Sequence, residues 1–301
     1  MNELPSIFFN VLTPVFTVIL VGYFAGPRLK LDVPSLTRLA YTVLVPAFVF
    51  DVISKADFPA GLAVRMVLFV QVIFVACAVA AWVVAKLLRR SPEVTAAYIL
   101  IASFANVGNF GLPIINFRLG ERGLEAATVF FVASVFISFA IGVTVANWHK
   151  GGGLGALWAV LKTPALLAVP PALLVNALNI TLPLAVSRPI SLIGSAMIPV
   201  MILTLGVQLA GIKVIKFTPD VIISSGVRLL IGPALALLLA VPFGLTGIER
   251  GAGILQTSMP TAILASLIAL QHDLLPDFVT TTVLFSTLAS VVTLTVMLAI
   301  V

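Results

Sequence analysis

The sequence predicts an all-α membrane protein with ten transmembrane helices, arranged as two inverted repeats of five helices, in which helices 4 and 9 are discontinuous. Three observations predict this fold class: the composition, the lengths of the uncharged runs, and proline motifs that recur in the second half. Of the 301 residues, 61% are hydrophobic and 9% are charged, whereas soluble domains carry about 25% charged residues. The composition therefore excludes a soluble globular domain.

Charged residues divide the chain into uncharged runs of suitable length, because a helix needs ~20 residues to cross the hydrocarbon core of a bilayer. One further span, around 33–54, has Arg38 and Asp51 near its ends. Together these segments make ten spans and leave only short loops. The uncharged runs are 4–27, 66–85, 94–117, 126–148, 163–187, 189–212, 229–248, 251–271 and 278–301.

The net charge of +6 would suggest a nucleic-acid partner for a soluble protein. Here most lysines and arginines fall in short loops, where they set orientation in the bilayer, so we expect lipid contact and no nucleic acid. Nine of them fall on one side and six on the other, which places both termini outside the cytoplasm. The cytoplasmic nine are Arg28, Lys30, Arg38, Lys86, Arg89, Arg90, Lys150, Lys213 and Lys216; the other six are Lys55, Arg65, Arg118, Arg122, Arg188 and Arg250.

Other features exclude several classes of protein. The first residues, MNELPS, include an acid and no basic residue, so we expect no cleaved signal peptide. Cys77 is the one cysteine, and His149 and His272 lie in predicted loops, so we expect no disulfide, metal site or other cofactor. The chain has no HExxH motif and no catalytic-sized loop, so we expect no enzyme.

Two proline motifs of the first half recur in the second. Pro46 in "TVLVPAFVF" matches Pro199 in "SAMIPVMIL", and Pro113 in "FGLPII" matches Pro260 in "TSMPTAI". The two pairs are separated by nearly the same number of residues. Because each half has five spans, the second half must be inverted, which is a signature of secondary transporters. The predicted units are residues 1–148, a cytoplasmic linker at 149–155, and residues 156–301.

The stretch "NVGNFGLP", residues 106–113, predicts an unwound middle of helix 4, with a counterpart at Pro260 in helix 9. Proline removes a backbone N–H, and irregular backbone at this depth is tolerated where it lines a cavity. Two crossing breaks would aim half-helix N-termini at one point, where an anion is favoured. Simple proline kinks and a helix-bridging Asn106 are the alternatives. The predicted substrate-binding residues are Asn106, Asn109, Gly111, Pro113, Gln256, Thr257, Ser258 and Pro260.

Several segments resemble the auxin efflux carrier family of membrane transporters, which includes plant auxin exporters and bacterial carriers related to malate and malonate transporters. They are "LTRLAYTVLVPAFVF", "SFANVGNFGLPIINFRLGERGLEAA", "MILTLGVQLA" and "QTSMPTAILASLIALQHD". The resemblance covers essentially the whole chain, and its most specific element is the Asn-x-x-x-x-Gly-x-Pro of span 4.

This resemblance implies a fold similar to that of bile acid symporters, with crossing discontinuous helices 4 and 9 and an elevator-like movement of one bundle against a static scaffold. It also implies that Asn106, seven residues before Pro113, contacts the substrate carboxylate. The chain has only about a dozen residues between spans 5 and 6, so it resembles the short bacterial branch. We therefore expect a multi-pass protein of a bacterial inner membrane.

Two charged residues near or within spans are candidates for ion coupling or for a counter-charge to the anion. Asp51 could carry a coupling proton or cation, or pair with Lys55. Arg228 lies more than two turns into span 8 and could offset an anionic substrate, although snorkelling to the cytoplasmic edge is the favoured interpretation. The coupling ion, H⁺ or Na⁺, stays open, as does assembly as a homodimer.

The sequence as a whole predicts a secondary active transporter of a small organic anion, a monocarboxylate or a dicarboxylate, with an auxin-like substrate among the options. The alternatives are an anion channel and a membrane receptor or sensor of the same fold. Channels usually line a continuous pore with polar residues, whereas the polar positions here cluster at one depth.

Overall fold

The computed structural model describes residues 3–57, 59–146, 162–212 and 215–301. Within these ranges the regular structure is helical, short loops join the helices, and one isolated backbone bridge is present. Seven of the described helical segments are long and apolar enough to cross a membrane, and three shorter apolar helices accompany them. The predicted all-α membrane protein is confirmed at this level. The linker expected at 149–155 lies outside the described residues.

In the first half, the helical segments Leu4–Arg28, Val33–Lys55 and Ala60–Leu87 correspond to the first three predicted spans, whereas Val107–Gly142 runs across parts of the predicted spans 94–117 and 126–148. The elements are α1 (Glu3–Ile7), η1 (Phe8–Leu12), α2 (Thr13–Arg28), α3 (Val33–Leu39), η2 (Ala40–Leu44), α4 (Val45–Lys55), α5 (Ala60–Leu87), α6 (Pro92–Ser103), η3 (Val107–Gly111) and α7 (Leu112–Ala146). The η elements are π-helical turns. Helix α7 contains a kink at Gly120, whose φ of 68° interrupts the helical backbone.

The second half follows a similar order of long and broken helices. Its elements are α9 (Pro164–Leu167), α10 (Val169–Ala177), α11 (Leu184–Ser195), α12 (Met197–Ala210), α13 (Pro219–Gly226), η4 (Val227–Ile231), α14 (Gly232–Ala240), α15 (Gly247–Thr257), α16 (Ile263–His272) and α17 (Pro276–Ile300).

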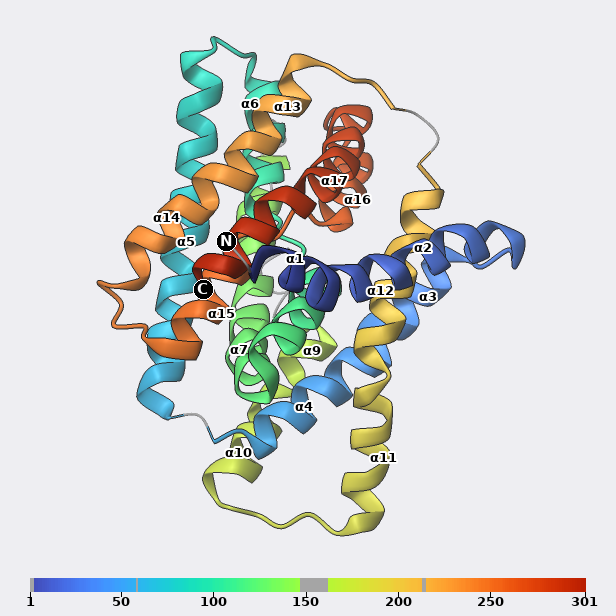
Figure 1. The fold of residues 1–301 in the computed structure, drawn as a ribbon, viewed down its shortest axis with the longest axis vertical. Helices are drawn as coiled ribbons and strands as arrows, with labels where there is room; N and C mark the ends of the chain where they lie inside the picture. The colour runs from blue at the N-terminus through green and yellow to red at the C-terminus, as the bar shows by residue number, and fades with distance from the viewer. Residues whose placement is uncertain (1–2, 58, 147–161, 213–214) are drawn as a thin grey trace.

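The helices form two groups (Figure 1). We call the first group the panel: it contains α2, α3, α4, α9, α10, α11 and α12, with α2 packed along α12 and α4 packed against α10 and α11. We call the second group the bundle: it contains α5, α6, α7 and α13 to α17, with α5 packed against α6 and α7, and α15 against α7. The two groups meet mainly along α4, α12 and the breaks in the bundle helices.

Glycines set the closest contact within the panel. A Cβ on Gly22 of α2 would overlap the carbonyl oxygen of Leu203, and a Cβ on Gly206 of α12 would overlap that of Ile19. Small residues let membrane helices approach until their backbones touch. The packing of α2 on α12 therefore depends on the absence of side chains at Gly22 and Gly206.

Two bundle helices are discontinuous, as predicted. Helix α6 ends at Ser103, and the chain is extended through 104–106 before η3 begins at Val107; helix α15 ends at Thr257, and α16 begins at Ile263. The location of the first break differs from the prediction, because residues 107–113 of "NVGNFGLP" are helical and the break precedes them. A wide π-helical turn over 107–111 continues directly into α7, which carries Pro113 as its second residue.

Candidate functional site

The two breaks lie side by side and are joined by backbone hydrogen bonds. The Asn106 amide donates to the Pro260 carbonyl at 2.8 Å, and the Ala262 amide donates to the Phe104 carbonyl at 2.7 Å. Ala105 and Thr261 face each other as an isolated antiparallel bridge. These two hydrogen bonds therefore pair four backbone groups that the helix breaks would otherwise leave without partners. Unpaired backbone groups are costly inside a membrane.

On one side of this bridge, two half-helices begin. Asn106 precedes η3, and its carbonyl accepts from the Phe110 and Gly111 amides at 3.3 and 3.0 Å. Ala262 precedes α16 and accepts from Ala265 at 3.0 Å. The first amides of a helix have no partner within the helix, and the N-terminal end carries roughly half a positive charge. Two positive helix ends therefore lie next to the same bridge.

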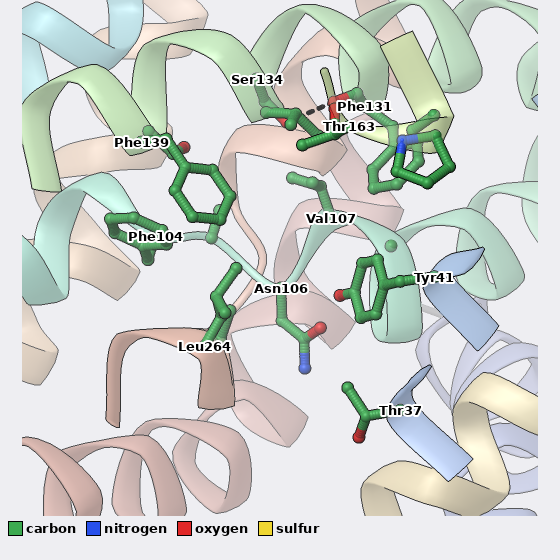
Figure 2. A pocket seen from close by; sticks show the side chains of 17 residues that line it. Thr37, Tyr41, Phe104, Asn106, Val107, Phe131, Ser134, Phe139, Thr163 and Leu264 are labelled. Carbon is green, nitrogen blue, oxygen red and sulfur yellow. Dashed lines mark hydrogen bonds between the residues drawn. The ribbon is translucent and has the colours of Figure 1, made fainter. Parts of the chain in front are cut away.

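A cavity of about 260 Å³ lies beside these helix ends, between the panel and the bundle. Figure 2 shows its residues from close by. The panel contributes residues of α3, η2 and α9, and the bundle contributes the first break, α7 and the start of α16. The lining residues are Thr37, Tyr41, Phe104, Ala105, Asn106, Val107, Gly108, Phe131, Ser134, Val135, Ser138, Phe139, Thr163, Pro164, Ala165, Ala262 and Leu264.

Asn106 is the polar residue that the first break contributes to this cavity. Its side chain is 4% exposed, and it points into the space bounded by Thr37, Tyr41 and Leu264 (Figure 2). Its Nδ2 has no hydrogen-bond partner among the described residues. A buried donor without a partner costs about 1–3 kcal/mol, so this amide is placed to donate to a molecule in the cavity.

The rest of the lining is mainly apolar. Phe104, Phe131 and Phe139 contribute aromatic rings, and the Phe104 and Phe139 centroids lie 5.9 Å apart at an interplanar angle of 78°. The Thr163 hydroxyl adds a second buried polar atom without a partner. No lysine, arginine, histidine or carboxylate lines the cavity in the part of the chain that the structure describes. This lining suits a small molecule with an apolar body and few polar groups.

Of the eight residues predicted to bind substrate, the structure places only Asn106 in this cavity. Asn109 is buried in η3, and its Oδ1 has no partner among the described residues. Pro113 lies in α7, and Pro260 lies in the second break, where its carbonyl accepts from Asn106. The binding roles of these residues stay predictions.

Gln256, Thr257 and Ser258 were expected to line a cavity, but they are fully buried and do not line this one. The Thr257 and Ser258 hydroxyls donate to carbonyls one turn back in α15, at 2.8 and 2.7 Å. The Gln256 Nε2 donates to the Ala127 carbonyl at 3.1 Å, and a Cβ on Gly111 would overlap its Oε1. These side chains are turned inward because they satisfy and pack the end of α15.

Arg228 does not snorkel, so that interpretation is wrong. Its side chain is 1% exposed, and the guanidinium donates to the Met259 carbonyl at 2.9 Å, to the Ala102 carbonyl at 2.7 Å and to the Thr257 carbonyl. These carbonyls belong to the ends of α6 and α15, where helices leave acceptors unpaired. The carbonyls at the two breaks accept the hydrogen bonds that water or lipid headgroups would accept if Arg228 snorkelled.

Asp51 lies apart from the cavity, near the end of α4. Its Oδ1 accepts from Ser191 at 2.6 Å and pairs with the Lys55 Nζ at 2.6 Å, and this Nζ also donates to Ser191 at 2.8 Å. The cluster ties α4 to α11. The structure therefore gives Asp51 the ion-pair partner that the sequence suggested, and its role in coupling stays a prediction.

Most of the lining residues were missed by the sequence analysis, although some carried a signal. Residues 131, 134, 135, 138 and 139 recur at the spacing of one helix face, and this stripe mixes phenylalanine and serine. Thr37 and Tyr41 are one helical turn apart. Such stripes also occur at ordinary helix contacts, so only the packing of α7 and η2 around the break identifies them as cavity residues.

A second cavity of about 470 Å³ lies farther along the contact between panel and bundle. Its lining includes Gln208 of α12, Ser266 of α16 and Asp277 of α17. The Gln208 Nε2 donates to Thr37 at 3.2 Å, which joins a residue of the second cavity to a residue of the first. The Gln208 Oε1 and the Ser266 hydroxyl are buried without partners among the described residues.

Known proteins with similar sequences are described as transporters. The family described as membrane transport protein matches residues 7–152 and 154–298. An uncharacterized transporter of Methanothermobacter thermautotrophicus is 24% identical over 93% of this chain and 94% of its own length. An uncharacterized transporter of Methanocaldococcus jannaschii is 25% identical over 88% and 89%. YfdV, an uncharacterized transporter of Escherichia coli, is 24% identical over 96% of both chains.

Proposed function

Because the chain belongs to the membrane transport protein family, the auxin efflux carrier family that its motifs resemble, we propose that it is a secondary active transporter of a small organic anion. The observation that carries this proposal is the unpartnered Asn106 amide, which lies in a cavity beside two half-helix N-termini. Amide donors and positive helix ends favour a carboxylate. The carboxylate would lie at the bridge between the two breaks.

We propose that the preferred substrate is a monocarboxylate with an apolar or aromatic body. The cavity offers the free Asn106 amide beside the bridge, and three phenylalanine rings contribute to the rest of its lining. A dicarboxylate would bury its second charge among these rings, which is costly when that charge has no partner. The malate-like alternative is therefore the weaker candidate, and it serves as the comparison in the assay.

The helix packing supports the finer proposal of ten helices in two inverted repeats, residues 1–148 and 156–301. Under this arrangement helix 1 corresponds to helix 6 and helix 2 to helix 7. The packing of α2 on α12 then corresponds to that of α10 on α4, and both occur. The packing of α5 on α6 likewise corresponds to that of α14 on α15, and both occur.

Elevator-type alternating access is the mechanism that we propose for the panel and the bundle. Both cavities lie between these two groups, and the breaks belong entirely to the bundle. The second cavity is lined by residues in or next to the segments 29–32, 211–212 and 273–275, which the charge count places in the cytoplasm. This conformation therefore fits a transporter open toward the cytoplasm of a bacterial cell, with the panel as the static part.

The test is counterflow in liposomes that contain the purified protein. Liposomes are loaded with unlabelled phenylacetate, indole-3-acetate or malate, and uptake of the same labelled acid is measured. We expect saturable uptake that internal substrate stimulates. Uptake of the aromatic acids should be faster than uptake of malate. Imposed H⁺ and Na⁺ gradients then identify the coupling ion. Flux that neither saturates nor responds to internal substrate would indicate a channel, and no flux with any acid would contradict the proposed transport.

A further inference from the structure

The crossing contains a buried positive charge that does not contact the cavity. Arg228 is the largest fully buried side chain of the described residues, yet it is absent from the cavity lining. It forms none of the ion pairs found in the described part of the chain, which join Asp51 to Lys55, Arg90 to Asp220, and Lys216 to Asp277. A buried charge without an opposite charge is costly, so the surroundings of Arg228 must offset it in another way.

The partners of Arg228 identify that offset. Its three hydrogen bonds to described residues end on carbonyls at the C-terminal ends of two half-helices: Ala102 in α6, and Thr257 and Met259 at and beyond the end of α15. A helix C-terminus carries roughly half a negative charge, and a cation is stabilised beside it. Two such ends together oppose about one positive charge. The guanidinium is therefore balanced by two helix dipoles instead of by a carboxylate.

This balance changes the field on the other side of the bridge. Two crossing half-helix pairs present two positive ends and two negative ends, so the crossing by itself is close to neutral. Because Arg228 offsets the two negative ends, the positive ends at Asn106 and Ala262 face the cavity without an opposing charge behind them. Low-dielectric surroundings make such a field stronger than it would be in water.

We propose that Arg228 is the positioning and charge-setting residue of the site. It holds the ends of α6 and α15 together and makes the cavity electropositive through the backbone, without touching the ligand. This deepens the proposed function, because it explains how an anion can be favoured in a cavity where none of the described lining residues is basic. Neutral donors such as a glutamine amide could satisfy one or two of the carbonyls but would bring no charge.

The test measures the local potential directly and requires no substrate. A reporter cysteine replaces Asn106 in a Cys77→Ala background, and its reaction rates with an anionic and a cationic methanethiosulfonate, the sulfonatoethyl and trimethylammonium-ethyl reagents, are compared. The ratio of the two rates reports the potential at residue 106, because the reactivity of the thiol itself cancels. Arg228→Lys retains the charge and loses the forked geometry, whereas Arg228→Gln loses the charge. Arg118→Gln is the control for a distant charge.

We expect the anionic reagent to be favoured when Arg228 is present, and the ratio to fall by about ten-fold in Arg228→Gln. Arg228→Lys should keep the ratio within about three-fold while lowering the melting temperature, and Arg118→Gln should leave the ratio unchanged. An unchanged ratio in Arg228→Gln would overturn the proposal. If Arg228→Gln does not fold, the Lys variant decides: a ten-fold fall despite the retained charge would mean that Arg228 acts only through geometry. A wrong substrate class would leave these rates unaffected.

Discussion

The backbone amide of Asn106 donates to the carbonyl of Pro260 at 2.8 Å, which fixes the break in one half of the chain against the break in the other. This hydrogen bond leaves the Asn106 side chain free to point into the cavity. It also brings the positive ends of η3 and α16 to the same place. The proposed binding site therefore combines two segments that are far apart in the sequence, one from each half of the chain.

Asn106→Ala should weaken substrate binding by about 10- to 100-fold, because a hydrogen bond to a charged group contributes about 1.5–3 kcal/mol. Asn106→Asp should bind still more weakly, because an ionised carboxylate would repel the anion. The melting temperature without ligand should change little, since the Asn106 Nδ2 bonds to no described residue. Calorimetric titration and thermal unfolding of the same purified variants measure both quantities.

Asn109→Ala is the matched control, because Asn109 is also a buried asparagine but does not line the cavity. We expect its affinity to stay within about three-fold of that of the parent protein. If Asn106→Ala bound normally and melted earlier, Asn106 would be a helix-bridging residue and would not bind substrate.

Gly206→Ala should destabilise the protein by at least about 1–3 kcal/mol, the usual cost of forcing extra volume into a packed contact. Its Cβ would overlap the Ile19 carbonyl and push α2 away from α12. Gly61→Ala is the control: a Cβ there meets nothing within 4 Å, and alanine favours the helix over glycine by up to ~1 kcal/mol. Thermal unfolding should therefore shift downward for the first variant and not for the second.

Pro260→Ala should reduce transport more than Pro113→Ala, because Pro260 lies within the extended break while Pro113 lies in a continuous helix that alanine can also form. Alanine at position 260 supplies the N–H that would let α15 continue through the break. Counterflow rates at matched expression measure the effect, with Pro14→Ala and Pro233→Ala as controls. Equal rates in all four variants would leave these prolines as ordinary kinks.

The predicted orientation can be tested with single cysteines in a Cys77→Ala background. Thr181→Cys and Val301→Cys should react with a membrane-impermeant thiol reagent from outside intact cells. Leu29→Cys should be protected until the membrane is opened, although Leu29 is 67% exposed. The charge count places Leu29 beside cytoplasmic Arg28 and Lys30. Labelling of Leu29→Cys from outside would reverse the proposed topology.

The local sequence is enough to predict the membrane-protein class, the approximate positions of several spans and the presence of two breaks. Each of these depends on local properties: the hydropathy of ~20 residues, the missing N–H of proline, and the charges that end each span. Even so, the first break lies at 104–106 and not across 106–113, because a π-helical turn accommodates Gly108 and Gly111 within a helix. The local composition indicated weak helix formation, but it did not indicate at which residues the helix is interrupted.

Which polar residues face the cavity depends on tertiary packing. Gln256, Thr257 and Ser258 resemble Asn106 in the sequence, yet they turn into the protein because the carbonyls of α7 and α15 accept their hydrogen bonds. Arg228 is buried because two helices distant in sequence end beside it and provide acceptors. Hydrogen-bond partners that come from other helices are absent from any local pattern, so the direction of a polar side chain is decided by packing.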